Sequence, residues 1–350
     1  MEARAASAKR CRPRSVRERG KLVLYVETGR TESQWNLAAE EYLFQTIRRQ
    51  DCFMLWQNEK SVIVGKHQNT WAEVNQAYLE QAHIPAVRRL SGGGAVYHDL
   101  GNINFTFITD RQDPNKMHLG IFCQPVIKAL AYLGIEAVVS GRNDLTIQGQ
   151  KFSGNSQYQK GNRLLHHGTL LFSSDLDAAE QALRTPCGKV GSSGIPSVRS
   201  RVTNVQEHLG RKISLAEFKK LLLQSVFSDR QPERYVWTAA AYEAVAKLAH
   251  EKYSAWQWNY GESPACAVRK KRRVEGCGTV EAAFQVSNGR IQSMRFYGDF
   301  FGSREPEELA ERFVGVPARA DSYRQVIQPV NLEEYFFHMD SDSFLRLLLE

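Results

Sequence analysis

The sequence predicts an α+β protein built from two domains. Its 350 residues are enough for two domains of ordinary size. Hydrophobic residues make up 42% of the chain and charged residues 24%, so globular cores can form. Apolar runs of strand length, such as Leu22–Val26 and Ser61–Val64, are interspersed with longer segments of helical period. Both kinds of element are therefore expected along the chain.

The first half of the chain is expected to alternate strands with helices. Lys21–Glu27 is predicted to be the first strand, and Ser33 the N-cap of a helix that continues through Arg49. Asn102–Ile108 alternates apolar with polar side chains, which is the period of a half-buried strand. The other predicted strands are Phe53–Trp56, Ser61–Gly65, Ala86–Leu90, Glu136–Val139, Leu145–Gln148 and Leu164–Phe172, and the other helices are Glu73–Ala82 and Lys116–Leu133.

The second half is expected to contain more helix. The turn signal Asn288-Gly289 predicts a hairpin between Val280–Val286 and Arg290–Tyr297. The segment Lys189–Arg201 is rich in Gly, Ser and Arg, which indicates a mobile loop. The predicted helices are Leu215–Phe227, Thr238–Lys252, Pro306–Phe313 and Asn331–Leu349.

The positive charge of the chain is concentrated at its N-terminus. The formal charge is +8, and residues 1–21 hold eight Lys/Arg and two Glu, a balance of +6. Residues 256–350 hold twelve Lys/Arg and fourteen Asp/Glu, a balance of −2. The excess therefore indicates a disordered basic leader over residues 1–20 and not a nucleic-acid-binding face. The remainder is expected to divide into a larger domain over residues 21–255 and a smaller one over residues 256–350.

The composition predicts a cytoplasmic protein without a structural metal. The six cysteines are scattered, and no pair has the two-residue spacing of a zinc or redox motif. No apolar stretch approaches the roughly 18 residues that a membrane span needs. The Arg- and Ala-rich leader leaves a mitochondrial location open as an alternative, because a transit peptide has that composition. A plain disordered leader or an over-long gene start also has this composition and is the favoured explanation.

The segment Arg88–Asp99, RRLSGGGAVYHD, is the first candidate binding site. Three consecutive glycines after a strand allow the backbone to approach a ligand closely. Successive N–H groups in such a turn can form an anion-binding nest, and Arg89 can add a bidentate hydrogen bond to phosphate or carboxylate. A hairpin turn alone would explain the glycines but neither the Arg pair nor His98-Asp99. The segment matches neither the Walker loop nor the dinucleotide-binding fingerprint.

Lys151 is the second candidate. It follows Gly141-Arg142-Asn143-Asp144 and begins the segment KFSGNS. A lysine beside an acyl phosphate would stabilise the charge of the leaving group and polarise the carbonyl. Asp144, and with it Asn143, could hold a magnesium ion through oxygen ligands. A lone strand lysine is usually solvated, so the functional interpretation depends on the glycine segment upstream.

Two further patterns allow more than one interpretation. His166 and His167 lie next to each other on a predicted strand, so they face opposite sides and cannot hold one metal ion together. One of them is expected to face a ligand cavity or a nearby loop, and a buried core histidine is as good an explanation. The basic run Arg269–Arg273 fits a solvated edge or loop, or a docking surface for an acidic partner.

These motifs together resemble the lipoate–protein ligase A family. The matching segments are RRLSGGGAVYHDLGN at Arg88–Asn102, GRNDL at Gly141–Leu145, KFSGNSQ at Lys151–Gln157, HHGTLL at His166–Leu171 and WNLAAEE at Trp35–Glu41. The resemblance runs from about Lys21 to the C-terminus. It implies a biotin/lipoate-ligase-like catalytic domain with mixed, largely antiparallel sheets flanked by helices. It also implies a small α+β accessory domain at the C-terminus.

The resemblance implies a two-step reaction. Lipoate and Mg-ATP would first form lipoyl-adenylate and pyrophosphate, and a lysine of an acceptor protein would then attack the adenylate and release AMP. Lys151 would be the catalytic residue, which contacts both the lipoate carboxyl and the phosphate, and Asp144 would lie on the Mg²⁺ side. The residues expected to contact ATP and the adenylate are Arg89, Gly94, Ala95, Val96, Tyr97 and Lys151.

The implied acceptors are apo lipoyl domains of 2-oxoacid dehydrogenase complexes and the glycine cleavage H protein. The enzyme is expected to act as a monomer, without nucleic acid or membrane. Because the lipoyl tail is a hydrocarbon chain ending in a dithiolane ring, its pocket should be apolar. Phe105 and Phe107, or their neighbours on the opposite face of the strand, are expected to line it.

Several alternative functions share parts of this pattern. An octanoyltransferase of the same fold would need a cysteine just before the motif lysine, but residues 124–150 contain none. A lipoyltransferase that accepts preformed lipoyl-AMP, or a nonenzymatic lipoate sensor, would keep the pocket. A biotin ligase is disfavoured, because its Arg- and Gly-rich adenylate loop is missing.

Overall fold

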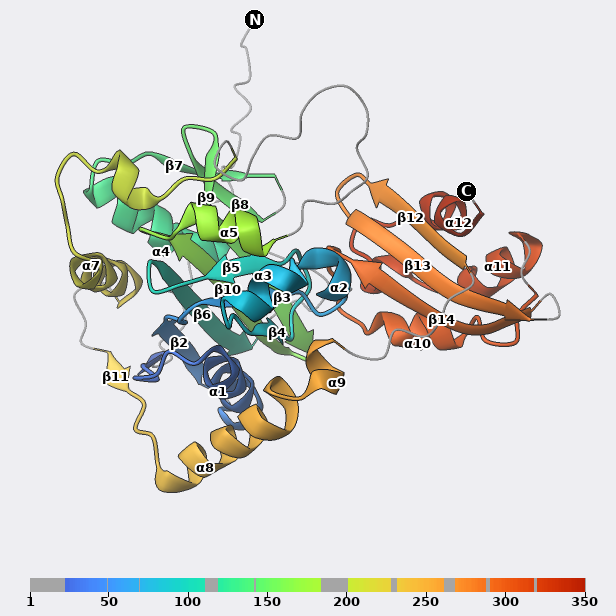
Figure 1. Cartoon of the computed structure of the whole chain (residues 1–350), viewed down its shortest axis with the longest axis horizontal. Helices are drawn as coiled ribbons and strands as arrows, with labels where there is room; N and C mark the ends of the chain where they lie inside the picture. The colour runs from blue at the N-terminus through green and yellow to red at the C-terminus, as the bar shows by residue number, and fades with distance from the viewer. Residues whose placement is uncertain are drawn as a thin grey trace, which may run out of the picture.

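The computed structural model consists of two α+β parts (Figure 1). Among the described residues, no helix is long and apolar enough to span a membrane. The structure describes residues 23–48, 50–68, 70–110, 119–141, 143–183, 201–227, 232–260, 268–287, 290–317 and 320–349. The predicted loop over residues 189–201 and the basic leader fall almost entirely outside these ranges.

An eight-stranded sheet is the centre of the larger part. Its strand order is β11-β1-β2-β6-β10-β9-β8-β7. Strand β1 is parallel to both β2 and β11, and every other pair in this sheet is antiparallel. The prediction of a mixed, largely antiparallel sheet is therefore confirmed. The strands are β11 (Glu233–Arg234), β1 (Val23–Val26), β2 (Asp51–Trp56), β6 (Asn102–Asp110), β10 (Arg163–Leu171), β9 (Gln150–Lys160), β8 (Asp144–Ile147) and β7 (Ala137–Ser140).

Helices cover both faces of this sheet (Figure 1). Helices α4 (Leu119–Tyr132) and α7 (Leu215–Phe227) pack on the face that carries Ile103 and Phe105 of β6. Helices α1 (Ser33–Thr46) and α8 (Ala239–Leu248), with the π-helical turn Ala249–Tyr253, pack on the other face. The strand period of two sends alternate side chains of β6 to the two faces.

A second, three-stranded sheet lies beside the first. Its order is β4-β3-β5, with β3 (Ser61–Val64) parallel to β4 (Ala86–Arg88) and antiparallel to β5 (Val96–His98). A small apolar cluster joins this sheet to neighbouring short helices. These helices are α3 (Gln76–Gln81) and α5 (Leu176–Ala182). Helix α2 (Thr70–Glu73) precedes α3, and a 3₁₀ turn lies at Val205–His208.

The C-terminal part is a three-stranded antiparallel sheet, β12-β13-β14, with helices packed against it (Figure 1). It has a separate hydrophobic core that contains Phe296, Phe313, Phe336 and Phe344. The predicted small α+β domain is confirmed. Its elements are β12 (Val268–Val274), β13 (Gly278–Ser287), β14 (Arg290–Gly298), α10 (Pro306–Glu311), α11 (Ala320–Ile327), the 3₁₀ turn Leu332–Glu334 and α12 (Ser341–Leu349).

Several predicted helices have different boundaries in the structure. Ser33 is the first residue of α1 and not its N-cap, which is Glu32, and the helix ends at Thr46 because Ile47 is extended. The predicted helix Glu73–Ala82 is two short helices, because the Asn75 side chain accepts a hydrogen bond from the Tyr78 N–H and starts α3 anew.

The predicted helix Asn331–Leu349 is also interrupted. The 3₁₀ turn ends at Glu334, and His338 then has a positive φ of 61°, which a continuous helix cannot contain. The Asp340 side chain then accepts a hydrogen bond from Ser343 N at 2.7 Å and begins α12. Helix α11 and strand β12 have no counterpart in the prediction.

Helix α9 (Trp256–Asn259) belongs structurally to the larger part. Trp258 Nε1 donates to Arg88 O at 2.7 Å, and Arg88 N donates to Asn259 Oδ1 at 2.9 Å. These bonds join α9 to strand β4. We therefore propose that the accessory domain begins after α9, a few residues beyond position 256.

Candidate active site

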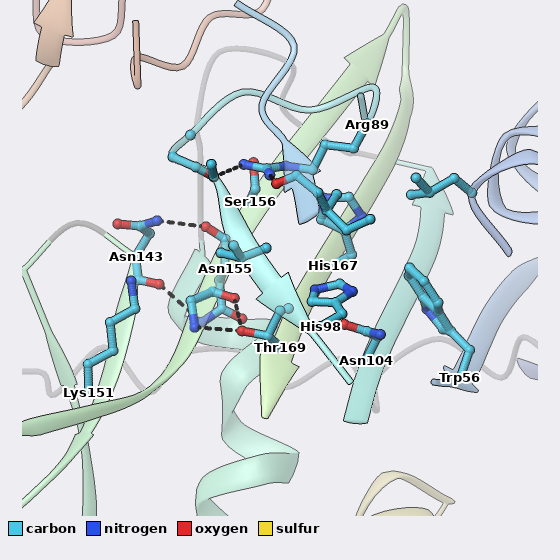
Figure 2. A pocket seen from close by; sticks show the side chains of 18 residues that line it. Trp56, Arg89, His98, Asn104, Asn143, Lys151, Asn155, Ser156, His167 and Thr169 are labelled. Carbon is cyan, nitrogen blue, oxygen red and sulfur yellow. Dashed lines mark hydrogen bonds between the residues drawn. The ribbon is translucent and has the colours of Figure 1, made fainter. Parts of the chain in front are cut away.

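The glycine turn Ser91–Gly94 joins β4 to the approach to β5 and forms one wall of a cavity (Figure 2). Gly93 has a φ of +90°, a conformation that residues with a Cβ rarely adopt. Gly65 follows β3, and a Cβ at that position would lie 1.9 Å from Gly93 O. The turn can take this shape only because both positions are glycine.

Arg89 holds the glycine turn from the protein side. Its Nη2 donates to the carbonyls of Gly92 at 2.6 Å and Gly94 at 2.9 Å, its Nη1 donates to Ile63 O at 3.1 Å, and its Nε donates to Ser91 Oγ at 3.1 Å. Burial lowers the pKa of Arg89 to about 10, so the guanidinium stays charged at neutral pH. Arg89 therefore places a fixed positive charge directly behind the turn.

Lys151, near the start of β9, lies on another wall of the same cavity (Figure 2). Its Nζ is 2.7 Å from Asp144 Oδ1, and the two side chains are 36% and 34% exposed. A Cβ at Gly154 would lie 3.2 Å from Lys151 Cε and Nζ, so the glycine leaves room for the lysine side chain. The backbone N–H of Thr203 donates to Lys151 O at 2.9 Å, which fixes the lysine backbone from its other side.

Asp144 is the residue predicted to hold a metal ion, and it lies beside Lys151. No group of three or more His, Cys, Asp or Glu side chains is positioned to hold a metal ion in the described part of the chain. Asp144 does not line the cavity and is paired with Lys151. Mg²⁺ commonly binds through one or two carboxylates plus substrate phosphates. Asp144 thus fits as a single ligand at most, and its role in metal binding stays a prediction.

Most predicted site residues line the cavity, but Tyr97 does not. Arg89, Gly94, Ala95, Val96 and Lys151 all line it. The side chain of Tyr97 points away into the small apolar cluster with Val62 and Leu79, because β5 sends Val96 and His98 to the cavity and Tyr97 to the opposite face.

The apolar wall of the cavity comes from elements that the sequence did not single out. Leu37 of α1, Trp56 of β2 and Ile63 of β3 form it. Phe105 and Phe107 instead lie in the core beneath α4 and α7. Their opposite-face neighbour Asn104, a polar residue, lines the cavity, and which residues contact the lipoyl tail stays a prediction.

The two adjacent histidines have different environments, as strand alternation predicts. His167 lines the cavity, whereas His166 is fully buried on the other face and stacks on Phe122 at 4.7 Å between ring centroids. Across β6, β10 and β9, Thr106, His167 and Ser156 are partners in register, so they form a polar row on the cavity face.

Glu40 of α1 connects this polar row to the glycine turn. His167 Nδ1 donates to Glu40 Oε1 at 2.9 Å, and on its other side His167 Nε2 is 2.6 Å from Ser91 Oγ. Thr106 Oγ1 also donates to Glu40 Oε1, at 2.6 Å, and accepts a hydrogen bond from Trp56 Nε1 at 2.9 Å. One buried carboxylate thereby orients both the turn and the aromatic wall.

Two family profiles match almost the whole described chain. Residues 32–227 match the profile described as "Lipoyl protein ligase A/B catalytic domain", and residues 263–348 match "Bacterial lipoate protein ligase C-terminus". A protein named lipoate–protein ligase 1 from Staphylococcus aureus is 40% identical over 320 residues, which cover 91% of this chain and 97% of that protein. The chain belongs to the lipoate–protein ligase family.

Solved structures agree with this assignment. The crystal structure of Plasmodium falciparum LipL1 in complex with lipoate has a TM-score of 0.73 and 23% identity, and the match covers 93% of this chain and 97% of that one. This likeness supports the fold. A lipoate–protein ligase A structure bound with ATP has a TM-score of 0.58 and 26% identity, and covers 69% of this chain and 98% of its own.

In this lipoate–protein ligase, the C-terminal domain covers the glycine turn. Phe300 O would lie 2.3 Å from a Cβ on Gly92, and the Phe301 ring would lie 3.3 Å from one on Gly93. The ring of Phe300 also stacks on His67, with centroids 4.7 Å apart and planes inclined by 9°. We call Phe300 and Phe301 the roof of the turn.

Two polar contacts hold the roof in place. Gly298 N donates to His67 O at 2.6 Å, and Lys66 forms an ion pair with Glu305 of the C-terminal domain. Arg88 supports the same segment from below, because its Nη1 donates to the carbonyls of Gly65 and Lys66, each at 2.9 Å. Arg88, the first arginine of the motif, is thus a structural residue beneath the domain contact.

Proposed function

We propose that this ligase activates lipoate with ATP and transfers the lipoyl group to a lysine of an acceptor domain. The observation that carries the proposal is the composition of one cavity. Its apolar wall of Leu37, Trp56 and Ile63 suits a hydrocarbon chain, while the glycine turn and Lys151 offer N–H groups and a cation to phosphate and carboxylate.

In the first step, a carboxylate oxygen of lipoate attacks the α-phosphorus of ATP. The bond from that phosphorus to the bridging oxygen breaks, and pyrophosphate leaves with its electron pair. Lys151 would exchange Asp144 for the carboxylate and the phosphate, because an ion pair that is one-third exposed contributes only about 0–1 kcal/mol. A Mg²⁺ ion, with Asp144 as a candidate ligand, would neutralise the departing phosphates.

In the second step, the neutral ε-amine of the acceptor lysine attacks the carbonyl carbon of lipoyl-AMP. The bond from that carbon to the phosphate oxygen breaks, AMP leaves, and the new amide loses a proton to solvent. Lys151 would polarise the carbonyl and stabilise the charge of AMP. The proposed acceptors are lipoyl domains of 2-oxoacid dehydrogenase complexes and the glycine cleavage H protein.

A thioester route through a cysteine has no support in this structure. Cys123, the cysteine that precedes Lys151 in the chain, lies within α4 in the main core, and its side chain is 2% exposed. Burial raises the pKa of its thiol to about 12, so little reactive thiolate forms at neutral pH. Cys123 also does not line the cavity.

Incubation of the enzyme with lipoate, Mg-ATP and an apo lipoyl domain tests the proposal. We expect mass spectrometry to show the added lipoyl group on the acceptor, and pyrophosphate release to accompany it. Modification with lipoyl-AMP but not with lipoate plus ATP would identify a transferase instead. Binding of lipoate with no modification in either case would indicate a sensor. Chelation of divalent ions should stop pyrophosphate release.

Glu40→Gln is expected to lower the rate of adenylate formation roughly 10- to 100-fold. This is the loss typically found when a residue that orients a site histidine by a hydrogen bond is replaced. The glutamine amide has no negative charge, and it keeps only one of the two acceptor oxygens that face His167 Nδ1. An NH₂ donor replaces the other oxygen at the 3.1 Å contact, so the hydrogen bond that orients His167 and sets its tautomer is weakened, and with it the contact between His167 Nε2 and the Ser91 hydroxyl. Single-turnover pyrophosphate release measures the effect.

Glu41→Gln is the matched control for this change. Glu41 is the neighbouring carboxylate of α1, but it accepts hydrogen bonds from Lys252 Nζ and Tyr253 OH, each at 2.7 Å, and does not line the cavity. The change should reduce stability without slowing the folded enzyme. Equal rate losses in the two variants would contradict the orienting role of Glu40.

A further inference from the structure

His98 is a polar residue at the apolar end of the cavity. In Figure 2, Lys151 and Asn143 lie on one side of the cavity and Trp56 on the other, with His98 and Asn104 toward Trp56. The His98 ring meets Trp56 edge to face, with centroids 6.3 Å apart. The carboxylate and the phosphate are expected to bind beside Lys151. The tail of the acyl chain is therefore expected at the opposite end of the cavity, beside Trp56.

A chain of amide hydrogen bonds fixes the tautomer of His98. Asn36 Nδ2 donates to the backbone carbonyls of Arg30 at 3.1 Å and Gln57 at 2.9 Å, which sets its amide orientation, because carbonyls only accept. The same Nδ2 lies 3.0 Å from Asn58 Oδ1, so Asn58 Nδ2 faces His98 Nδ1, at 3.1 Å. An NH₂ group only donates. His98 Nδ1 is therefore the acceptor, and Nε2 carries the proton.

The Nε2–H of His98 is a buried donor without a protein partner. His98 is 3% exposed, and its Nε2 has no hydrogen-bond partner in the described part of the chain. Burial, with smaller contributions from Arg89 and His167, lowers the pKa of His98 to about 3, so the ring is neutral. Since His98 lines the cavity and its Nδ1 faces Asn58, Nε2–H is the ring group whose hydrogen bond is left for a ligand to complete.

We propose that His98 selects acyl chains that end in a dithiolane ring over all-carbon chains. This inference rests on the proposed function of the cavity. The ring sulfurs are the only hydrogen-bond acceptors in the lipoate tail, and sulfur is a weak acceptor. The octanoate tail has no hydrogen-bond acceptor, so it would leave the Nε2–H of His98 unpaired. A substrate that leaves a buried polar group unpaired binds less tightly, so octanoate would be disfavoured.

A comparison of substrates with the unmodified enzyme tests the inference. The probes are lipoate, octanoate and cyclopentylpentanoate, in which both ring sulfurs are CH₂ groups and the ring shape is kept. We expect kcat/KM for adenylate formation to be roughly 5- to 20-fold higher for lipoate than for cyclopentylpentanoate, as one weak buried hydrogen bond predicts. Equal values would overturn the inference and leave the proposed function standing. Turnover of none of the three acids would overturn the proposed function.

His98→Phe and His166→Phe form a matched pair. Both histidines accept a side-chain amide at Nδ1, from Asn58 and Gln157 respectively, each at 3.1 Å, and both have an unpartnered Nε2. Only His98 lines the cavity. We expect His98→Phe to reduce the ratio of lipoate to cyclopentylpentanoate kcat/KM to about 1, and His166→Phe to leave that ratio unchanged. An unchanged ratio in His98→Phe would overturn the inference.

The tautomer can be measured without any substitution. In the ¹⁵N-labelled wild-type protein, we expect the ring-nitrogen shifts of His98 to be those of a neutral imidazole protonated at Nε2. Addition of lipoate, but not of octanoate, should then shift the Nε2 resonance. A ring protonated at Nδ1 would contradict the inference even if His98→Phe fails to fold.

Discussion

Lys151→Ala is expected to lower the rate of lipoyl-adenylate formation at least roughly 10²- to 10³-fold, the loss seen when one preorganised charge-stabilising donor is removed. The physical reason is that no other cation on that wall of the cavity is available among the described residues. Two other lining residues there, Asn143 and Asn155, are neutral amides, and each donates to the backbone carbonyl of the other. Stopped-flow measurement of pyrophosphate release, with saturating lipoate and Mg-ATP, gives this rate directly.

Lys160→Ala is the control for that experiment. Lys160 is the last residue of the same strand β9, is exposed, and does not line the cavity. We expect unchanged turnover from this variant. The stability of Lys151→Ala should also stay within about 1 kcal/mol of wild type, because its ion pair with Asp144 is partly exposed. Near wild-type turnover of Lys151→Ala would overturn the assignment of this lysine.

Gly65→Ala is expected to lower adenylate formation by roughly 100-fold, the effect of displacing a reacting group by about 1 Å. A methyl group at position 65 would lie 1.9 Å from Gly93 O, so the glycine turn must move away. The same overpacking should lower the free energy of unfolding by about 1–3 kcal/mol. Urea denaturation and pyrophosphate release on the same sample separate the two effects.

Gly120→Ala is the control for the glycine change. A Cβ at Gly120, in the first turn of α4, meets no atom within 4 Å. Because alanine is the better helix former, we expect equal or slightly higher stability and no loss of activity. If Gly65→Ala folds normally and keeps full activity, the turn does not depend on its close approach to β3.

The positions of the glycine turn and of Lys151 on one cavity could be predicted from the sequence, because the patterns that single them out are local. Three glycines after a strand indicate a close backbone approach wherever the rest of the chain lies. The structure uses Arg89 to hold the carbonyls of this turn, so its contact with an anion stays a prediction. Strand alternation also separated His166 from His167 correctly, and the structure places only His167 on the cavity. Each of these inferences depends on residues within a few positions of each other.

The residues that orient the site could not be predicted, because their contacts are distant in sequence. Glu40 meets His167 across 127 positions, and Trp56 reaches Thr106 across 50. Nothing in the pattern of α1 distinguishes Glu40 from Glu41 before the helix packs on the sheet. The prediction treated Gly94 to Tyr97 as one surface, whereas β5 alternates its faces and places the Tyr97 side chain in the small apolar cluster, so a contact of Tyr97 with the adenylate stays a prediction.

Strand β12 of the accessory domain was not predicted, because its sequence is mostly basic. Five consecutive basic residues make Arg269–Arg273 resemble a solvated run, yet they form most of β12 and pair with β13. An edge strand tolerates such charges, since one of its sides faces no neighbouring strand. Arg269 pairs with Glu281 across this ladder at 2.9 Å, so part of the basic charge is neutralised within the sheet.

Because of the roof, the part of the cavity at the glycine turn is built from both domains. Phe300 and Phe301 contact the turn from a domain with its own hydrophobic core, and the Lys66–Glu305 ion pair is one of the described links between the two domains. Cleavage of the backbone between α9 and β12 would therefore yield two pieces that must associate to complete the cavity. The rate of catalysis by such a split enzyme would depend on the concentrations of both pieces. Dilution would abolish activity, although each piece would stay folded.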